Sequence, residues 1–212
     1  VGPEGLVGEK ALGQVSVLEA AVNKVGLNGH CGVGHTRWAT HGKPSSENAH
    51  PHYSNDTLAV VHNGIIENHQ ALKSDLMAKG YEFISETDTE VVAHLLHYHL
   101  KKQPDIEQRR EVLCQALREL EGAYAIAVIF KDLPDHIFGA RMGSPLVLGV
   151  STEESYLASD PLALLQVTDR MSYLENGDVV VLTPQKIEIS DLNGHSIERP
   201  VERFVHGDQA AD

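Results

Sequence analysis

Hydrophobic and polar residues follow two different rhythms in the two parts of the chain. Up to about residue 120, apolar residues recur at helical spacing and predict helices at residues 15–25, 67–79, 87–102 and 105–120. The third of these opens with Thr87 and Glu90, the spacing of a capping box. Extended apolar patterns between the helices predict strands at residues 31–38, 57–66 and 81–85, with Asn63-Gly64 interrupting the second strand.

The second part of the chain carries short apolar runs separated by turn residues. These runs predict strands at residues 123–130, 136–141, 146–151, 155–159, 178–183 and 186–192, with a brief helix at 161–167. Asn193-Gly194 is the clearest hairpin signal. Helices followed by many strands favour an α+β fold of antiparallel sheets covered by helices over alternating βαβ units. The polar segment 196–212 is predicted to be a linker that follows one domain of residues 1–195.

Composition narrows the functional classes. The 212 residues fit one domain, and 42% hydrophobic residues suffice for a packed core. The 17 Lys and Arg against 30 Asp and Glu give a net charge of −13, which argues against nucleic acid as a partner. No apolar run approaches the ~20 residues that cross a membrane, and no signal peptide is recognisable. Two distant cysteines, Cys31 and Cys114, fit a reducing, cytoplasmic setting rather than a disulfide framework.

Five of the 13 histidines fall between residues 35 and 62. His50 and His52 flank Pro51 and could offer two metal ligands, but no Cys or His pair stands at a zinc-like spacing. Hydrogen-bonded loop histidines are therefore favoured over a metal site, and no metal or other cofactor is predicted.

Several polar residues have both a structural and a functional interpretation. Arg37, in a mostly apolar strand, needs either an ion-pair partner in the fold or a cleft in which its planar fork binds a substrate carboxylate. Asp88 either complements a helix dipole or serves as counter-ion to a substrate ammonium. Asn63-Gly64 marks either a bulge or turn, or an oxyanion hole. Arg37 and Asp88 together would recognise an α-amino acid.

The strings HTRWATHG, NAHPH, VHNGIIENH, SETDTE and GSPL occur in this order. Together they resemble the glutaminase (class II glutamine amidotransferase) domain of the glucosamine-6-phosphate synthase family, the isomerising glutamine–fructose-6-phosphate aminotransferases, over nearly the whole chain. The resemblance implies an N-terminal-nucleophile (Ntn) hydrolase fold, a four-layer αββα sandwich of two antiparallel sheets, incomplete at the N-terminus. It also implies an intact enzyme of amino sugar biosynthesis. That enzyme hydrolyses glutamine to glutamate and passes ammonia to fructose 6-phosphate, which becomes glucosamine 6-phosphate.

The resemblance also assigns roles to residues. Arg37 would bind the α-carboxylate of glutamine and Asp88 its α-ammonium, while Asn63 and Gly64 would act in catalysis as the oxyanion hole. Three further residues would also bind substrate. Thr40 and His41 would lie on the loop that closes over glutamine, and Trp38 would lie where the family's Trp controls the passage of ammonia.

One departure from the family concerns the nucleophile, an N-terminal Cys that is absent from this sequence. Cys31 is internal and Cys114 lies in a predicted helix, so neither is expected to be catalytic. The chain is therefore expected to be an inactive fragment, separated from the sugar-isomerase domain that would be its partner in an intact, homodimeric enzyme. Three alternatives stay open: a non-catalytic glutamine-binding regulatory module, the glutaminase domain of another class II amidotransferase, and a histidine-rich metal-binding β-domain.

Overall fold

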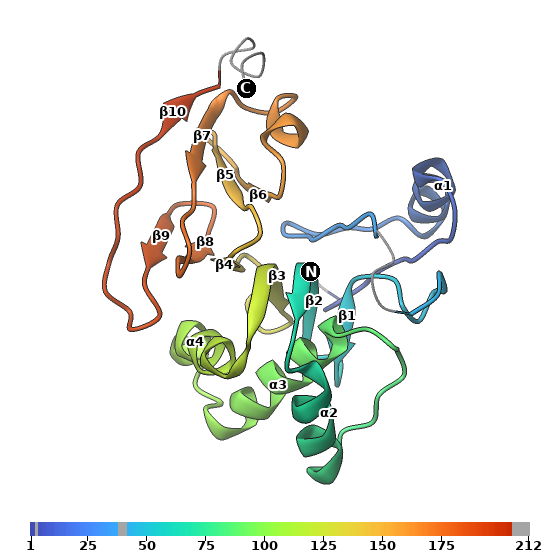
Figure 1. Cartoon of the computed structure of the whole chain (residues 1–212). Coiled ribbons are helices and arrows are strands. Elements are labelled where there is room, and N and C mark those ends of the chain that lie inside the picture. The colour runs from blue at the N-terminus through green and yellow to red at the C-terminus, as the bar shows by residue number, and fades with distance from the viewer. Residues whose placement is uncertain (3, 38–41, 205–212) are drawn as a thin grey trace, which may run out of the picture.

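Two antiparallel sheets form the frame of the molecule (Figure 1). The computed structural model describes residues 1–2, 4–37 and 42–204. One sheet has six strands in the order β1-β2-β3-β4-β8-β9, and the other has four in the order β10-β7-β5-β6. The strands are β1 His52–Ser54, β2 Leu58–Ile66, β3 Gly122–Phe130, β4 Ile137–Met142, β5 Val147–Val150, β6 Ser155–Ala158, β7 Arg170–Tyr173, β8 Val179–Leu182, β9 Ile187–Ser190 and β10 Glu202–Arg203.

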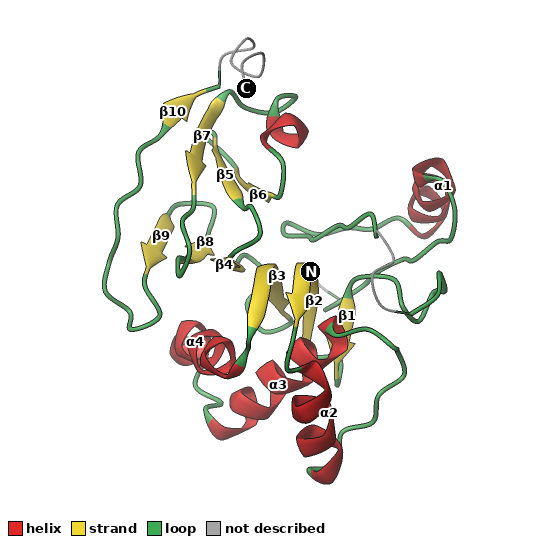
Figure 2. Cartoon of the chain, viewed as in Figure 1, coloured by secondary structure: helices red, strands yellow, loops and turns green. Residues whose placement is uncertain are grey.

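Three helices cover one face of the six-stranded sheet (Figure 2). They are α2 (His69–Ala78), α3 (Thr89–Lys102) and α4 (Arg109–Glu119). Their apolar sides share one core with strands β2, β3, β4 and β8, in which Leu96 and Phe130 are fully buried. Burial of a side chain of this size contributes roughly 1.5–3 kcal/mol, so this layer contact stabilises the fold substantially.

Helix α3 begins at the junction that positions the candidate site. Thr87 Oγ1 accepts the Glu90 N–H at 3.4 Å, which is the first half of a capping box. The Glu90 carboxylate does not return to residue 87. It accepts instead from the N–H groups of Ile84 and Ser85, at 2.9 and 2.7 Å. Thr87 and Glu90 therefore stabilise both the start of α3 and the preceding loop at residues 84–85.

The second sheet packs on the other face of the first. Leu148 and Leu174 form a core there with Ala125, Val180 and Leu182 of the six-stranded sheet. A short 3-10 helix, η2 (Pro161–Leu164), covers the far side of the four-stranded sheet. Helix α1 (Val15–Val25) lies apart from these layers in Figure 1 and buries none of its residues.

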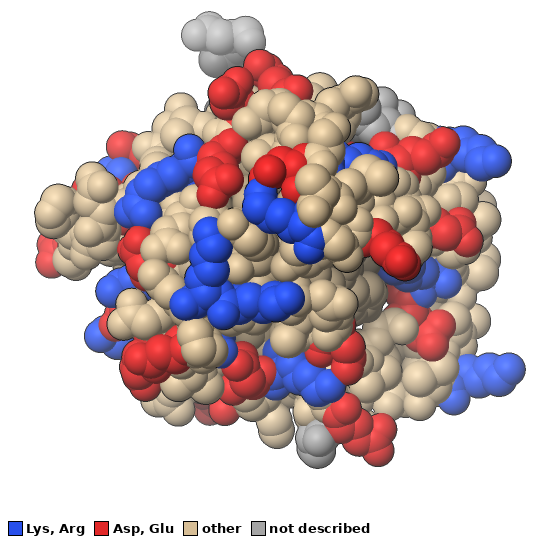
Figure 3. All heavy atoms as spheres, turned by 90° about the horizontal axis from the view of Figure 1, so that it is seen from below, with Lys and Arg blue, Asp and Glu red and all other residues tan. Residues whose placement is uncertain are grey.

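The outer surface of helices α2–α4 carries charges of both signs. Figure 3, seen from that side, shows Lys and Arg side chains interspersed with Asp and Glu. Two of the ion pairs are Lys79–Asp75 at the end of α2 and Arg118–Glu111 on α4. Within the described residues no helix has the length and apolar character needed to cross a bilayer.

Most of the predicted elements are confirmed. Helix α1 has the predicted bounds, and α2 and α3 lie within the predicted segments. The segment 105–120 contains a 3-10 turn, η1 (Ile106–Gln108), followed by α4. All strand pairs are antiparallel, and the turn at Asn193-Gly194 closes with Gly194 N–H donating to Asp191 O at 3.1 Å.

Three expectations about strands are wrong. Residues 31–37 and 81–85 do not form strands, and Asn63-Gly64 does not interrupt β2. The first two segments have apolar, extended sequences, but no neighbouring segment pairs with them in a regular ladder in the described part of the chain. Three short strands were not predicted, namely β1, β7 and β10, and the apolar segment 161–167 holds only the 3-10 turn η2.

The predicted linker at residues 196–212 is described only as far as residue 204. Arg199 donates to both carboxylate oxygens of Asp178 at 2.8 Å, and Glu202–Arg203 pairs with β7. The domain boundary at residue 195 stays a prediction.

Candidate functional site

A cavity of about 190 Å³ lies where β2, the start of α3 and the segment before residue 38 meet. Four of the predicted site residues line it: Arg37, Asn63, Gly64 and Asp88. The other lining residues are His35, Thr36, His50, His62, Thr87 and Thr89. The predicted residues Trp38, Thr40 and His41 lie outside the described residues. Four residues from three distant parts of the sequence therefore share one cavity.

Strand β2 carries Asn63 and Gly64 to the cavity without a bulge. Its pairing with β3 runs in continuous register from Leu58 opposite Phe130 to Ile66 opposite Gly122. Gly64 has φ +128°, and a Cβ at this position would lie 2.0 Å from Ala123 O. Only glycine fits this combination of backbone conformation and close approach. The dipeptide is thus part of a regular ladder, and both structural interpretations made from the sequence, a bulge or a turn, are wrong.

The Asn63 amide is oriented by a histidine. His35 Nε2 and Asn63 Oδ1 are 2.8 Å apart, and because an amide oxygen only accepts, the imidazole donates. Burial lowers the pKa of His35, and the nearby Arg37 lowers it further, against the opposing effect of hydrogen bonds to Asn63 and His62. A neutral His35 protonated on Nε2 satisfies this geometry. The Asn63 NH2 group then lies on the opposite side of the amide from His35.

Asp88 immediately precedes α3 but does not cap the helix with its side chain. Its Oδ2 accepts from the Ile66 N–H of β2 at 2.8 Å, and the residue is only 4% exposed. A buried carboxylate is costly unless hydrogen bonds or a cation compensate its charge. The structure therefore places a carboxylate in the cavity wall that is attached to the end of β2 rather than used for capping.

The guanidinium of Arg37 contacts the first residues of the polar segment 42–48. Its guanidinium donates to the carbonyl oxygens of Gly42 at 3.1 Å and Lys43 at 3.4 Å. These two carbonyl groups help to hold the side chain in place at the cavity. Arg37 lines the cavity, and its role there stays a prediction.

The histidines around the cavity are hydrogen-bonded to threonines. His50 Nε2 and His62 Nδ1 each lie 3.0 Å from Thr89 Oγ1, and His52 Nε2 lies 3.0 Å from Thr87 Oγ1. Burial lowers the pKa of His50 to about 2 and that of His52 to about 4. The cavity is consequently lined by neutral imidazoles near pH 7. Among the described residues no group of three or more His, Cys, Asp or Glu is placed to hold a metal ion.

Neither cysteine lines this cavity. Cys114 is buried in α4, and Cys31 Sγ lies 3.4 Å from the carbonyl oxygen of His136. Burial raises the pKa of each thiol to about 11. Both thiols are therefore protonated near pH 7, and neither has the thiolate character of a nucleophile.

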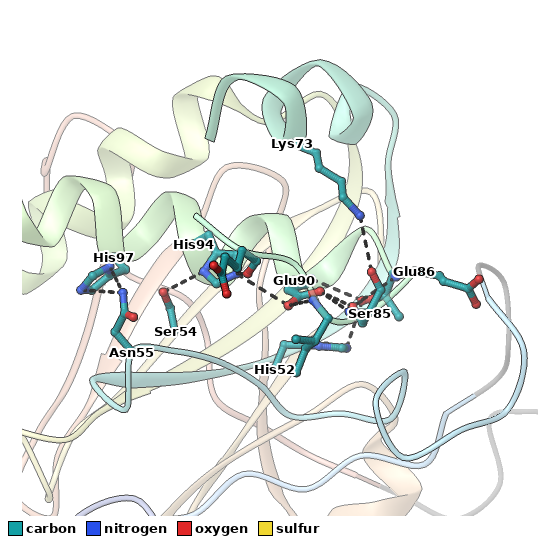
Figure 4. Close-up of polar contacts among 12 residues, drawn as sticks. His52, Ser54, Asn55, Lys73, Ser85, Glu86, Glu90, His94 and His97 are labelled. Carbon is teal, nitrogen blue, oxygen red and sulfur yellow. Dashed lines mark hydrogen bonds and ion pairs between the residues drawn. The ribbon is translucent and has the colours of Figure 1, made fainter. Parts of the chain in front are cut away.

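A buried polar network supports the Asp88 side of the cavity, and the sequence analysis did not identify it as part of the site. Figure 4 shows Glu90 between Ser85 and His94. Besides the two backbone N–H groups, Glu90 accepts from Ser85 Oγ at 2.6 Å. Burial alone would raise the pKa of Glu90, but hydrogen bonds from His94, Ile84 and Ser85 lower it to about 2. The capping-box spacing was the available signal, and it indicated only a helix start.

Comparison with known sequences gives consistent matches. A family model described as "Glutamine amidotransferase domain" matches residues 35–166. A protein of Pseudomonas syringae pv. tomato named glutamine–fructose-6-phosphate aminotransferase (isomerizing) is 52% identical over 200 residues, which are 94% of this chain and 32% of that protein. The protein of the same name from Pseudomonas aeruginosa is 48% identical over 203 residues, 96% of this chain and 33% of that protein. The chain spans about a third of the length of the curated relatives it matches.

Solved structures agree with these sequence matches. The glutamine phosphoribosylpyrophosphate amidotransferase from B. subtilis superposes with a TM-score of 0.60 and 27% sequence identity, covering 74% of this chain and 34% of that one. A structure described as the allosteric regulatory enzyme of purine biosynthesis superposes with a TM-score of 0.60 and 28% sequence identity. This match also covers 74% of this chain and 34% of that one. The expected Ntn-hydrolase arrangement of two antiparallel sheets with helices is confirmed.

Proposed function

The chain belongs to the glutamine amidotransferase domain family, and from this premise we propose that its cavity binds glutamine by the α-amino acid head group. The observation that carries the proposal is the presence of Arg37 and Asp88 in the wall of one cavity of about 190 Å³. Arg37 supplies a fork-shaped cation for the α-carboxylate, and Asp88 supplies an anion for the α-ammonium. Each charge of the head group thereby has a partner when water is excluded.

The Asn63-Gly64 segment is suited to the other end of the substrate. Attack on the glutamine side-chain amide places negative charge on its oxygen, and an amide N–H can stabilise that charge. His35 holds Asn63 Oδ1, so the NH2 of Asn63 is the group that remains to donate. Removal of one such donor typically costs about 3–4 kcal/mol of transition-state stabilisation. We assign Asn63 and Gly64 this role, and we exclude Cys31 and Cys114 as the attacking group because neither lies at the cavity.

For the whole protein we propose the activity that the relatives' names state. Glutamine is hydrolysed to glutamate in this domain, and the ammonia is transferred to fructose 6-phosphate, giving glucosamine 6-phosphate, on a sugar-isomerase domain. Support comes from 52% identity to a named aminotransferase over 94% of this chain. A cytoplasmic location, a homodimer, a domain boundary near residue 195 and substrate contacts from Trp38, Thr40 and His41 are parts of the same proposal.

Titration with L-glutamine, followed by NMR or calorimetry, tests the proposal. Arg37→Lys should raise the Kd about tenfold, because Lys keeps the charge but cannot bind a carboxylate with two parallel bonds. Asp88→Asn should raise it about 30-fold or more, since it leaves the ammonium without a counter-ion at a cost of about 2 kcal/mol or more.

Matched controls are available on the surface. Arg110→Lys and Asp75→Asn change the same residue types at exposed ion pairs away from the cavity, and both should leave the Kd unchanged. Equal effects of the cavity variants and the surface variants, with all proteins folded, would refute the proposed head-group site.

A further inference from the structure

The two sides of the proposed head-group site are joined by one buried side chain, Asn48. Arg37 and Asp88 are 51 positions apart in the sequence (88 minus 37) and lie in different segments. Asn48 is only 2% exposed and is not among the residues that line the cavity. Asn48 therefore lies outside the cavity wall, but it bonds to Lys43, whose carbonyl also binds Arg37, and to Glu86, two residues before Asp88.

On the Arg37 side, Asn48 shares an acceptor with the guanidinium. Lys43 O accepts from Asn48 Nδ2 at 3.0 Å and from Arg37 Nη1 at 3.4 Å. The neighbouring carbonyl of Gly42 accepts from Arg37 Nη2 at 3.1 Å. These two carbonyl groups therefore help to position the guanidinium, and Asn48 binds one of them.

On the Asp88 side, Asn48 bonds to Glu86, two residues before Asp88. Asn48 Oδ1 accepts the Glu86 N–H at 2.9 Å, and Asn48 Nδ2 donates to Glu86 Oε2 at 3.1 Å. The same loop is fastened from the other side by Glu90 through Ile84 and Ser85. Figure 4 shows Glu86 pointing away from this Glu90 network. The loop is thus held at two points, and Asn48 is the one that faces Arg37.

The packing at this link leaves no free space. Gly42 has φ +72°, and a Cβ there would lie 2.6 Å from Asn48 Nδ2 and 2.9 Å from Glu86 Cβ. The backbone that binds Arg37 therefore lies directly against the Asn48–Glu86 pair. A change in the distance between the segments 42–43 and 84–88 would have to disrupt this contact.

We propose that Asn48 is a positioning residue that sets the separation between Arg37 and Asp88. The inference rests on the proposed function, because it concerns the two residues assigned to the glutamine head group. Two charges on one carbon of a ligand benefit from two protein partners only if those partners are held at the matching distance before binding. Loss of Asn48 should therefore lower the affinity for a ligand that binds Arg37 and Asp88 at the same time. The affinity for a ligand that binds only one of the two residues should change little.

NMR titrations of the folded chain with three ligands distinguish the effect on binding to both residues from the effect on binding to each residue alone. L-Glutamine makes both contacts, 4-carbamoylbutanoate lacks the ammonium, and 4-aminobutanamide lacks the carboxylate. For Asn48→Ala we expect the Kd of glutamine to rise about tenfold, and that of each single-charge ligand to change by less than about threefold, because the gain from joining two contacts is what the link maintains. Glu86→Ala removes the bond from Asn48 Nδ2 but keeps the backbone bond to Asn48 Oδ1, so it should give the same pattern with a smaller rise for glutamine. Because Glu86 is exposed, this variant serves as the test if Asn48→Ala does not fold.

Asn68→Ala is the matched control. Asn68 also bridges two segments through its amide, with Nδ2 donating to Glu119 O and Oδ1 accepting the Glu121 N–H, but it lies outside the cavity. It should leave the Kd of all three ligands unchanged. A rise of equal size for all three ligands in Asn48→Ala, or no rise for glutamine, would overturn the positioning role while the head-group site stands. Failure of the unchanged protein to bind glutamine would instead overturn the proposed function itself.

Discussion

The hydrogen bond between His35 and Asn63 is the residue-scale feature with the most direct chemical consequence. An asparagine amide can point either its oxygen or its NH2 group toward a substrate, and only the second stabilises a developing oxyanion. With Asn63 Oδ1 held at 2.8 Å by His35 Nε2, the orientation is fixed. This depends on a neutral imidazole protonated on Nε2.

The protonation state of His35 is a testable prediction. Burial lowers its pKa below the ordinary 6.5, so a lower pH is needed to protonate it. At pH 7, above even the ordinary pKa of 6.5, His35 should be mostly neutral with the proton on Nε2. Long-range proton–nitrogen NMR correlations report the tautomer directly, and loss of the signals in His35→Gln assigns them. Two equivalent imidazolium nitrogens for His35 at pH 7 would contradict this account of Asn63.

At the scale of single elements, strand β2 shows why the sequence was misleading in one place. Asn-Gly is a frequent turn dipeptide, and local pattern alone favours an interruption there. The ladder from β3, about 60 residues later, extends along the whole strand and imposes an extended backbone on both residues. By contrast, residues 31–37 and 81–85 have strand-like sequences without a paired neighbour. Strands depend on non-local partners, whereas α3 could be predicted from its own apolar spacing and cap.

Gly64 provides a prediction at this scale. Gly64→Ala should lower the free energy of unfolding by more than about 2 kcal/mol, because it combines a strained positive φ with a collision against Ala123 O. Gly80→Ala is the matched control, since Gly80 has φ +88° and no atom within 4 Å of the added Cβ. It should cost about 1 kcal/mol from backbone strain alone. Urea denaturation of both variants measures the difference, and equal losses would show that the close approach to β3 is unimportant.

At the scale of the whole molecule, the sequence predicted the fold class and four of the residues that meet in the cavity, namely Arg37, Asn63, Gly64 and Asp88. The residue types of Arg37 and Asp88 already matched the chemistry of an amino acid head group. Asn48 and the supporting role of Glu90 could not be predicted, because each acts on segments that are close only in the folded chain. Residue type indicates which groups can bind a charge, but the contacts that hold those groups in place appear only with the tertiary structure.

The buried histidines predict how the stability of the whole molecule depends on pH. Burial lowers the pKa of His52 from 6.5 to about 4, with Lys10 and Arg37 adding to the shift and Glu90 and Asp88 opposing it. Below pH 6.5 the unfolded chain binds a proton that the folded chain does not, so stability falls as the pH falls toward 4. The free energy of unfolding should decrease by at least about 1 kcal/mol between pH 7 and pH 5.

His52→Gln tests whether this residue contributes to that decrease. The variant should show a smaller decrease over the same interval, by about 1 kcal/mol. Glu90 affects stability in a different pH range. Its pKa is lowered from 4.5 to about 2, so its contribution to the free energy of unfolding is lost only as the pH falls below about 4.5. Identical pH profiles for the variant and the unchanged protein would show that folding does not change the pKa of His52.

A crystal structure of the chain with bound L-glutamine tests the central claim most directly. The account predicts the amino acid in the cavity of Arg37, Asn63, Gly64 and Asp88, with two hydrogen bonds from Arg37 to the α-carboxylate and the α-ammonium within about 3 Å of Asp88. Arg37 should keep its bonds to Gly42 and Lys43, as a site organised in advance requires. Glutamine bound elsewhere, or bound here with its carboxylate away from Arg37, would contradict the account.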